Sequence, residues 1–187
     1  MATVSNVSVG KPKIGGGVYV APITITSQQM PSDASTALDS AFINLGYVSE
    51  DGVTNSGTEA GTDINAWGGD VVLNVSGAQS DTFALTFIES LNVDVLKEVY
   101  GSANVTGTLS SGITVKTNKA ALAARVWVIE MIMNSGALHR IVIPHGTITE
   151  RGETVYKDDT PIGYAVTILA APDASGNTHY DYIKAGT

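Results

Sequence analysis

The sequence predicts a mainly β fold, a sandwich or barrel of two packed antiparallel sheets, with one short flanking helix at about residues 92–100. The composition supports this, because 20 of the 187 residues are glycine and only 15% are charged, which is typical of β proteins with many turns. Most apolar segments alternate with a period of two, and one segment changes to a period of four. The length is typical of one domain, expected over residues 18–187.

The predicted helix follows a strand within residues 81–101. Residues 83–87 alternate large apolar with smaller side chains, which indicates a strand with one buried face. Asn92 is a suitable N-cap, and Gly101 is suitable for the position just past the C-terminus. The positions that repeat every four residues and predict the buried side are Leu91, Val95 and Val99.

The other strands are expected from period-two patterns between turn residues. The segment 123–133 is apolar on both faces, so both faces should be covered, and 134–136 should turn the chain into its partner 138–144. Pro22 should end a strand or lie at a sheet edge. The remaining predicted strands are 18–26, 41–49, 53–58, 70–75, 82–88, 112–117, 162–171 and 180–183.

Residues 1–17 are predicted to form an N-terminal arm. Valines alternate with polar residues, and glycines 15–17 provide a hinge before the first core strand. Such a segment would suit an added strand on the sheet edge of another molecule, and the alternative is a terminus without fixed structure. A second arm is possible at about 173–187.

A long loop is predicted at about 50–69. A turn at 50–52 is followed by a polar, acidic and glycine-rich segment in which Ile64 and Trp67 are the large apolar residues. Loops of this length in a compact domain are functional or disordered. Trp67 would be either a local anchor or a contact for a neighbouring subunit.

The charge is unevenly distributed. The formal net charge is −8, and no Lys or Arg occurs from Ile14 to Leu96, a span with ten acidic residues. This distribution argues against binding to nucleic acid, which requires clustered cations. Two interpretations remain: the acidic half maintains solubility, or it forms a surface that repels a polyanion.

No catalytic or metal-binding motif is present. The histidines at 139, 145 and 179 lack zinc-site spacing, and no phosphate-binding loop or nucleophile elbow occurs. We therefore expect no enzyme activity, cofactor or metal. The longest apolar run, 126–133, is far shorter than a membrane span and contains Glu130, so no membrane association is expected.

Five segments together resemble a known family, the major tail (tail-tube) proteins of long-tailed, non-contractile bacteriophages of the siphophage type. The segments are KPKIGGGVYVAP (11–22), FINLGYVSEDGVTN (42–55), TFALTFIESLNVDVLKEVYG (82–101), RVWVIEM (125–131) and GYAVTILAAPD (163–173).

The resemblance implies a structural virion protein of the tail. Six subunits would form a ring, and rings would stack into a tube through which DNA passes during ejection without being specifically bound. Implied partners are further copies of the chain and the tape-measure, tail-tip and tail-terminator proteins, with assembly in the host bacterial cytoplasm. Alternatives are a tube protein of a contractile tail, bacteriocin or secretion machine, or a carbohydrate-binding or adhesion β-sandwich.

The resemblance also implies that the long loop reaches the adjacent ring and that the termini contact neighbours. The inter-subunit or inter-ring residues would then be Val4, Val7, Val9, Lys11, Lys13, Glu50, Asp51, Val53, Asn55, Glu59, Asp63 and Trp67. The acidic residues expected to line the channel are Asp70, Asp81 and Glu150.

Overall fold

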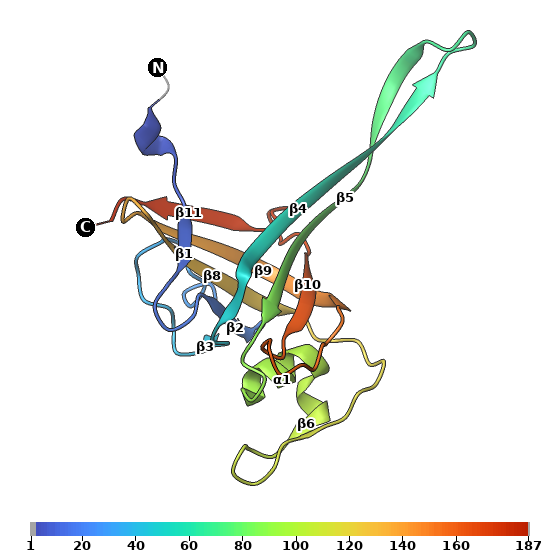
Figure 1. The fold of residues 1–187 in the computed structure, drawn as a ribbon. Helices are drawn as coiled ribbons and strands as arrows, with labels where there is room; N and C mark the ends of the chain where they lie inside the picture. Colours follow the sequence, from blue (N-terminus) through green and yellow to red (C-terminus); the bar gives the residue numbers. More distant parts are fainter. Residues whose placement is uncertain (1–2, 187) are drawn as a thin grey trace.

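A computed structural model describes residues 3–186 and confirms a mainly β fold with one short α-helix (Figure 1). The strands form one nine-stranded sheet and one two-stranded sheet. The elements are β1 (Gly10–Pro12), β2 (Val18–Pro22), β3 (Ile43–Asn44), β4 (Val48–Asn65), β5 (Val71–Phe87), α1 (Val93–Tyr100), β6 (Val105–Thr106), β7 (Thr114–Val115), β8 (Arg125–Met133), β9 (Leu138–Arg151), β10 (Tyr164–Ala170) and β11 (Tyr180–Lys184), with 3-10 turns at Val4–Asn6 and Ser102–Asn104.

The large sheet curls around one core. Its strand order is β3-β2-β8-β9-β10-β5-β4, while β1 pairs beside β2 on β8 and β11 pairs with β9. Val18 of β2 and Phe83 of β5 belong to the same buried cluster although their strands lie four positions apart in the sheet. A flat sheet could not bring them together, so the sheet must bend back on itself.

Strand β8 is covered on both faces, as its apolar pattern predicts. Trp127 is 1% exposed within the main core, and its indole Nε1 donates a hydrogen bond to the Gly146 carbonyl at 3.0 Å. A Cβ at Gly146 would lie 2.3 Å from the indole, so only glycine allows this close packing. On the opposite face, Val126 and Val128 form a second cluster that residues of the 23–42 segment cover.

Helix α1 begins and ends where the sequence predicts. The Asn92 side chain accepts a hydrogen bond from the Asp94 backbone N–H at 3.0 Å, and Gly101, with φ 92°, lies at the C-cap. Val95 and Val99 are buried against the main core. Leu91 was expected on this buried face but is 63% exposed, because it precedes the N-cap and lies outside the helix.

The expected loop at 50–69 is instead part of a long β-hairpin. Strand β4 continues to Asn65, the turn occupies 66–70, and β5 returns to Phe87. Residues 49–52 form a bulge between the pairs Val48↔Phe87 and Val53↔Leu85, and no hairpin turn occurs there. The expected separate strands 70–75 and 82–88 are both parts of β5. The prediction failed because the outer part of the hairpin, residues 57–80, is rich in glycine and polar residues and its strands pair only with each other.

Both terminal segments contribute strands to the same molecule. Gly10–Pro12 pairs with β8, opposite Met133–Met131, and β11 pairs with β9, Tyr180 lying opposite Val142. The predicted strand at 41–49 is reduced to β3 and the start of β4. The predicted strands at 123–133 and 162–171 are confirmed as β8 and β10.

Truncating Trp127 should destabilise the fold strongly. Trp127→Ala removes the largest fully buried side chain and its hydrogen bond to Gly146, so we expect a loss of about 3–5 kcal/mol in the free energy of unfolding. Urea denaturation checks this value. A loss below about 1 kcal/mol would contradict a closely packed indole.

Candidate inter-subunit surfaces

The outer part of the β4–β5 hairpin is a two-stranded ribbon that projects from the body (Figure 1). Strand β10 pairs with β5 only from Asp81 to Phe87. We define the ribbon as residues 57–80, in which β4 and β5 pair only with each other. At the usual strand rise, the ribbon extends roughly 30 Å beyond the sheet. Within residues 3–186 the two strands of this segment pair only with each other, and an isolated two-stranded ribbon is marginally stable in water.

One face of the ribbon is apolar and exposed. Ile64 lies directly opposite Leu73, and Val75 lies two residues from Leu73 on β5, so these three side chains share a face, while Val71 lies beyond a register shift next to the turn. The exposed fractions of the four side chains lie between 45% and 60%. The opposite face is polar, because the Asn74 amide donates to the Asp63 carboxylate across the strands.

Trp67 stands at the turn of the ribbon. The turn is closed by two backbone hydrogen bonds, from Ala66 N–H to the Asp70 carbonyl at 2.8 Å and from Gly69 N–H to the Ala66 carbonyl at 3.0 Å. Gly68 and Gly69 have φ values of 126° and 98°, which disfavour other residues. The indole of Trp67 is fully exposed, so the local-anchor interpretation is wrong for the isolated chain.

The base of the ribbon is held by Asp81. Its carboxylate accepts hydrogen bonds from Asn55 on β4 and from Thr178 and His179 before β11, each at 2.6 Å. Partial burial raises the pKa of Asp81, but the hydrogen bonds from Thr178, Asn55 and His179 outweigh it and lower the pKa overall. His179 in turn contacts Asp181. The carboxylate therefore joins the ribbon to the C-terminal segment.

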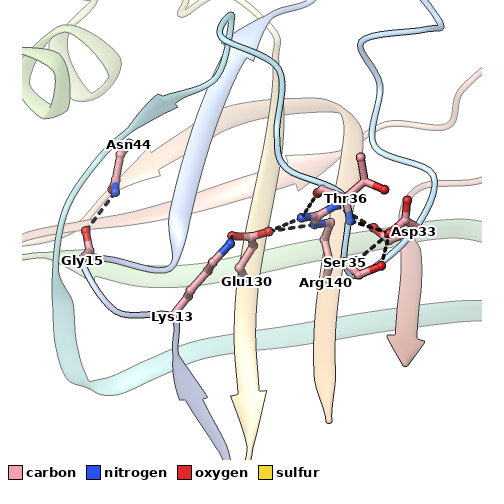
Figure 2. Close-up of polar contacts among 8 residues, drawn as sticks. All are labelled: Lys13, Gly15, Asp33, Ser35, Thr36, Asn44, Glu130 and Arg140. Atoms are coloured by element: carbon pink, nitrogen blue, oxygen red, sulfur yellow. Dashed lines mark hydrogen bonds and ion pairs between the residues drawn. The ribbon is translucent and has the colours of Figure 1, made fainter. Parts of the chain in front are cut away.

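A buried ion pair fixes the opposite side of the body (Figure 2). Glu130 and Arg140 lie directly opposite each other on β8 and β9, and their side chains are 5% and 2% exposed. The Arg140 guanidinium donates to Glu130 and to the backbone carbonyls of Asp33 and Thr36, at 2.6 and 2.8 Å. Arg140 thereby fastens the loop that covers the second apolar cluster.

The N-terminal arm attaches to the same ion pair. Lys13 Nζ donates to the second Glu130 oxygen at 2.8 Å, and Asn44 Nδ2 donates to the Gly15 carbonyl at 2.9 Å (Figure 2). The Lys13 side chain is 47% exposed, so it can leave Glu130 while Arg140 still neutralises that carboxylate. The arm is thus held by Lys13, by Asn44 and by the pairing of β1 with β8.

The sequence-predicted interface residues fall into three places. On the arm, Val4, Val7 and Val9 are exposed, and Lys11 is exposed within β1. In the β4 bulge, Glu50 and Asp51 are exposed, whereas Val53 is half-buried against the core. The exposed residues on the ribbon or near its base are Asn55, Glu59, Asp63, Trp67 and Asp70.

The structure does not group the three predicted channel residues. Asp70 lies at the ribbon turn, the Asp81 side chain is 12% exposed, and Glu150 is exposed on β9. The Glu130–Arg140 pair and the apolar face of the ribbon were not predicted. One signal for the pair was available, since a charged residue at the centre of each strand of a predicted hairpin suggests cross-strand pairing.

A comparison with protein families decides the class of this molecule. The family described as phage tail tube protein matches residues 5–186. The chain belongs to this family. A search of curated proteins finds no match. As a tail tube protein, the chain is a structural component of a phage virion tail, and structural families of this kind are normally not enzymes.

Two kinds of feature, a membrane-spanning helix and a group of metal-holding side chains, are absent from residues 3–186. No helix in this part of the tail tube protein is long and apolar enough to cross a membrane. The same residues contain no group of three or more His, Asp or Glu side chains arranged to hold a metal ion.

Removing one member of the buried ion pair should cost far more than removing Lys13. Arg140→Met leaves the buried Glu130 with a single exposed partner, and we expect a loss of about 3–5 kcal/mol in the free energy of unfolding. Lys13→Met should cost about 0–1 kcal/mol, as for exposed pairs. Denaturant unfolding measures both. The double variant Glu130→Met/Arg140→Met should cost less than Arg140→Met, and an equal or greater cost would show that charge burial does not dominate.

Acidification should loosen the contact between the C-terminal segment and the ribbon base. Because the pKa of Asp81 is lowered in the folded state, its contribution is present above the unfolded value of about 4 and is lost as the pH falls through the lower folded value. The protection factors of the backbone amides of residues 178–184, which correct hydrogen exchange for its intrinsic pH dependence, should fall in that range. In Asp81→Asn the exchange should already be faster at pH 7, and unchanged exchange in this variant would contradict the role of the carboxylate.

Proposed function

We propose that this chain forms six-membered rings that stack into a tail tube, and that DNA passes through the central channel during ejection. Family membership supports the tail tube, and the projecting ribbon supports the stacking. A ribbon with an exposed apolar face and an exposed Trp67 at its turn is suited to contact the next ring. The ribbon is the observation on which the proposal rests.

The channel surface is proposed to be the side of the β4–β5–β10–β9 sheet that faces away from the core. One row across these strands consists of Thr54, Ala84, Thr167 and Glu150, which lie opposite one another in register. Adjacent positions on this face include Thr82, Thr86 and Ala165. Small uncharged side chains with an occasional carboxylate offer the DNA backbone little to bind, and Arg151 at the border of this face is engaged by the Asn118 carbonyl and the Tyr100 ring.

Among the three acidic residues predicted for the channel, Glu150 has the best support. It is exposed and accepts a hydrogen bond from Thr167 on this face at 3.3 Å. Asp81 is engaged at the ribbon base, and Asp70 lies at the turn, so their positions favour a role at ring contacts.

The tube is proposed to be of the non-contractile type, built with tape-measure, tail-tip and tail-terminator proteins and assembled in the host cytoplasm. The exposed arm residues Val4, Val7 and Val9 would add contacts between subunits. A contractile-tail or secretion tube would use the same protomer fold, and the presence of a sheath around the tube in the source phage distinguishes these cases.

Removing the ribbon should separate folding from assembly. Replacing residues 59–79 by Asn-Gly joins Thr58 to Ser80 through a two-residue hairpin turn and retains the body of the sheet. We expect a cooperatively folded protein that forms no tubes in electron micrographs, whereas the unaltered chain forms tubes at high concentration.

A single substitution and its control refine this test. Trp67→Ala should raise the concentration needed for tubes at least tenfold, while Tyr156→Ala, which also truncates an exposed aromatic residue, should leave it unchanged. Normal tubes from the ribbon deletion would contradict the stacking role. A chain that remains monomeric under all conditions, including with tail-tip complexes, would contradict the proposed function itself.

A further inference from the structure

The chain contains a basic segment that is the counterpart of its acidic one. No Lys or Arg occurs from Ile14 to Leu96, and no Asp or Glu occurs from Val99 to Ile129. The second span carries three cations, Lys116, Lys119 and Arg125. The ribbon belongs entirely to the first span, whereas β6, β7 and the loop before β8 belong to the second.

The two segments lie at opposite ends of the molecule. In Figure 1 the ribbon turn is at the top, and α1, β6 and the yellow loop that leads to β8 are at the bottom. The ribbon carries Glu59, Asp63 and Asp70, and the lower end carries Lys116 and Lys119 beside the paired charges of α1, Asp94 with Lys97 and Glu98 with Arg125. Ends of this kind are suited to a head-to-tail contact, which is the open, filament-forming type. The chain therefore carries both halves of an electrostatically complementary contact.

Two cations at the lower end are available for a partner. Arg125 pairs with Glu98 at 3.0 Å, and Lys97 pairs with Asp94 at 3.3 Å. Lys116 and Lys119 are exposed, and within residues 3–186 their side chains form no salt bridge.

A recess lies beside these cations. It has a volume of about 260 Å³ and is enclosed by the end of α1, the 3-10 turn Ser102–Asn104 and the loop 118–125. Its wall includes Ala121 and Leu122, and Lys116 N–H bonds the Asn104 carbonyl at 2.8 Å, which keeps Lys116 at the rim. The recess thus combines a small apolar wall and two paired cations, Lys97 and Arg125, with the exposed Lys116 and Lys119 on the adjoining chain.

We propose that the ribbon turn of one copy docks in this recess of a second copy. Trp67 would contact the apolar wall, and the acidic residues Glu59, Asp63 and Asp70 would face Lys116 and Lys119. This inference rests on the proposed function, because it assigns the receptor for the stacking contact of the tube. Each ring then presents ribbons on one side and recesses on the other.

Charge also distinguishes this recess from an apolar groove near the sheet edges. That groove, of about 450 Å³, lies between β8 and the bulge of β4 and includes Val18 and Ile129. Its border carries Glu50 and Asp51, which would repel the acidic ribbon turn. The recess beside α1 provides attraction where that groove provides repulsion.

A charge-swap experiment tests the pairing. Glu59→Lys/Asp70→Lys and Lys116→Glu/Lys119→Glu alter side chains that form no hydrogen bonds among the described residues, so folding should be preserved and is checked by thermal denaturation. Each double variant should raise the concentration needed for tubes at least tenfold at low salt. The fourfold variant, which restores opposite charges, should recover most of the loss. If both double variants assemble as the unaltered chain does, or the fourfold variant shows no recovery, the pairing is overturned.

Cysteine cross-linking tests the location directly, because the chain has no cysteine. Ala66→Cys next to Trp67 combined with Ala121→Cys in the recess should yield ladders of covalent oligomers when tubes are oxidised. The matched control Ala66→Cys/Ala171→Cys, with an exposed alanine outside the recess, should remain monomeric on denaturing gels.

The outcomes separate the two proposals. Tubes without ladders from the first cysteine pair would overturn the recess and leave the tail tube function standing. An unaltered chain that forms no tubes would overturn both.

Discussion

The fold depends on one constraint: strand β8 must bury both of its faces. Trp127 and Ile129 point into the main core, and Val126 and Val128 point into the second cluster, so the sheet has to curl over one face and the 23–42 segment has to cover the other. Glu130 lies on the second face within this apolar strand, and Arg140 both neutralises it and binds the covering segment. The same ion pair then provides the attachment for Lys13 of the arm.

The ribbon, in contrast to β8, is not covered by other elements among residues 3–186. Its strands lose their third neighbour beyond Asp81, and the side chains at Ile64 and Leu73 have nothing to cover them. A protein that worked as a monomer would gain nothing from such a segment, and an exposed two-stranded ribbon is a site of uncontrolled association. In the proposed stacked tube the same features would form a defined contact, because each ribbon would have one position to occupy on the next ring.

The sequence predicts those parts of this structure that are buried within the chain. Burial explains the alternation in residues 83–87 and the two-sided apolar pattern of 123–133. A local hydrogen bond explains the N-cap at Asn92, and the structure confirms all three features. The ribbon escaped prediction because no face of it is buried in the protomer, so its glycines and acidic residues resembled those of a loop. The acidic composition of that region was visible, but its position at one pole of the molecule required the fold.

The different charges at the two ends of the protomer favour an assembly that grows in one direction. If both ends carried the same charge, subunits would repel each other or pair symmetrically, and a symmetric pair closes on itself without extending. The acidic residues of the ribbon are separated in space from Lys116 and Lys119 because β5 carries the chain from the ribbon down to α1. Strand β5 thus sets both the reach of the ribbon and the distance between the charged ends, so in the proposed tube the geometry of this hairpin would set how far apart successive copies stand.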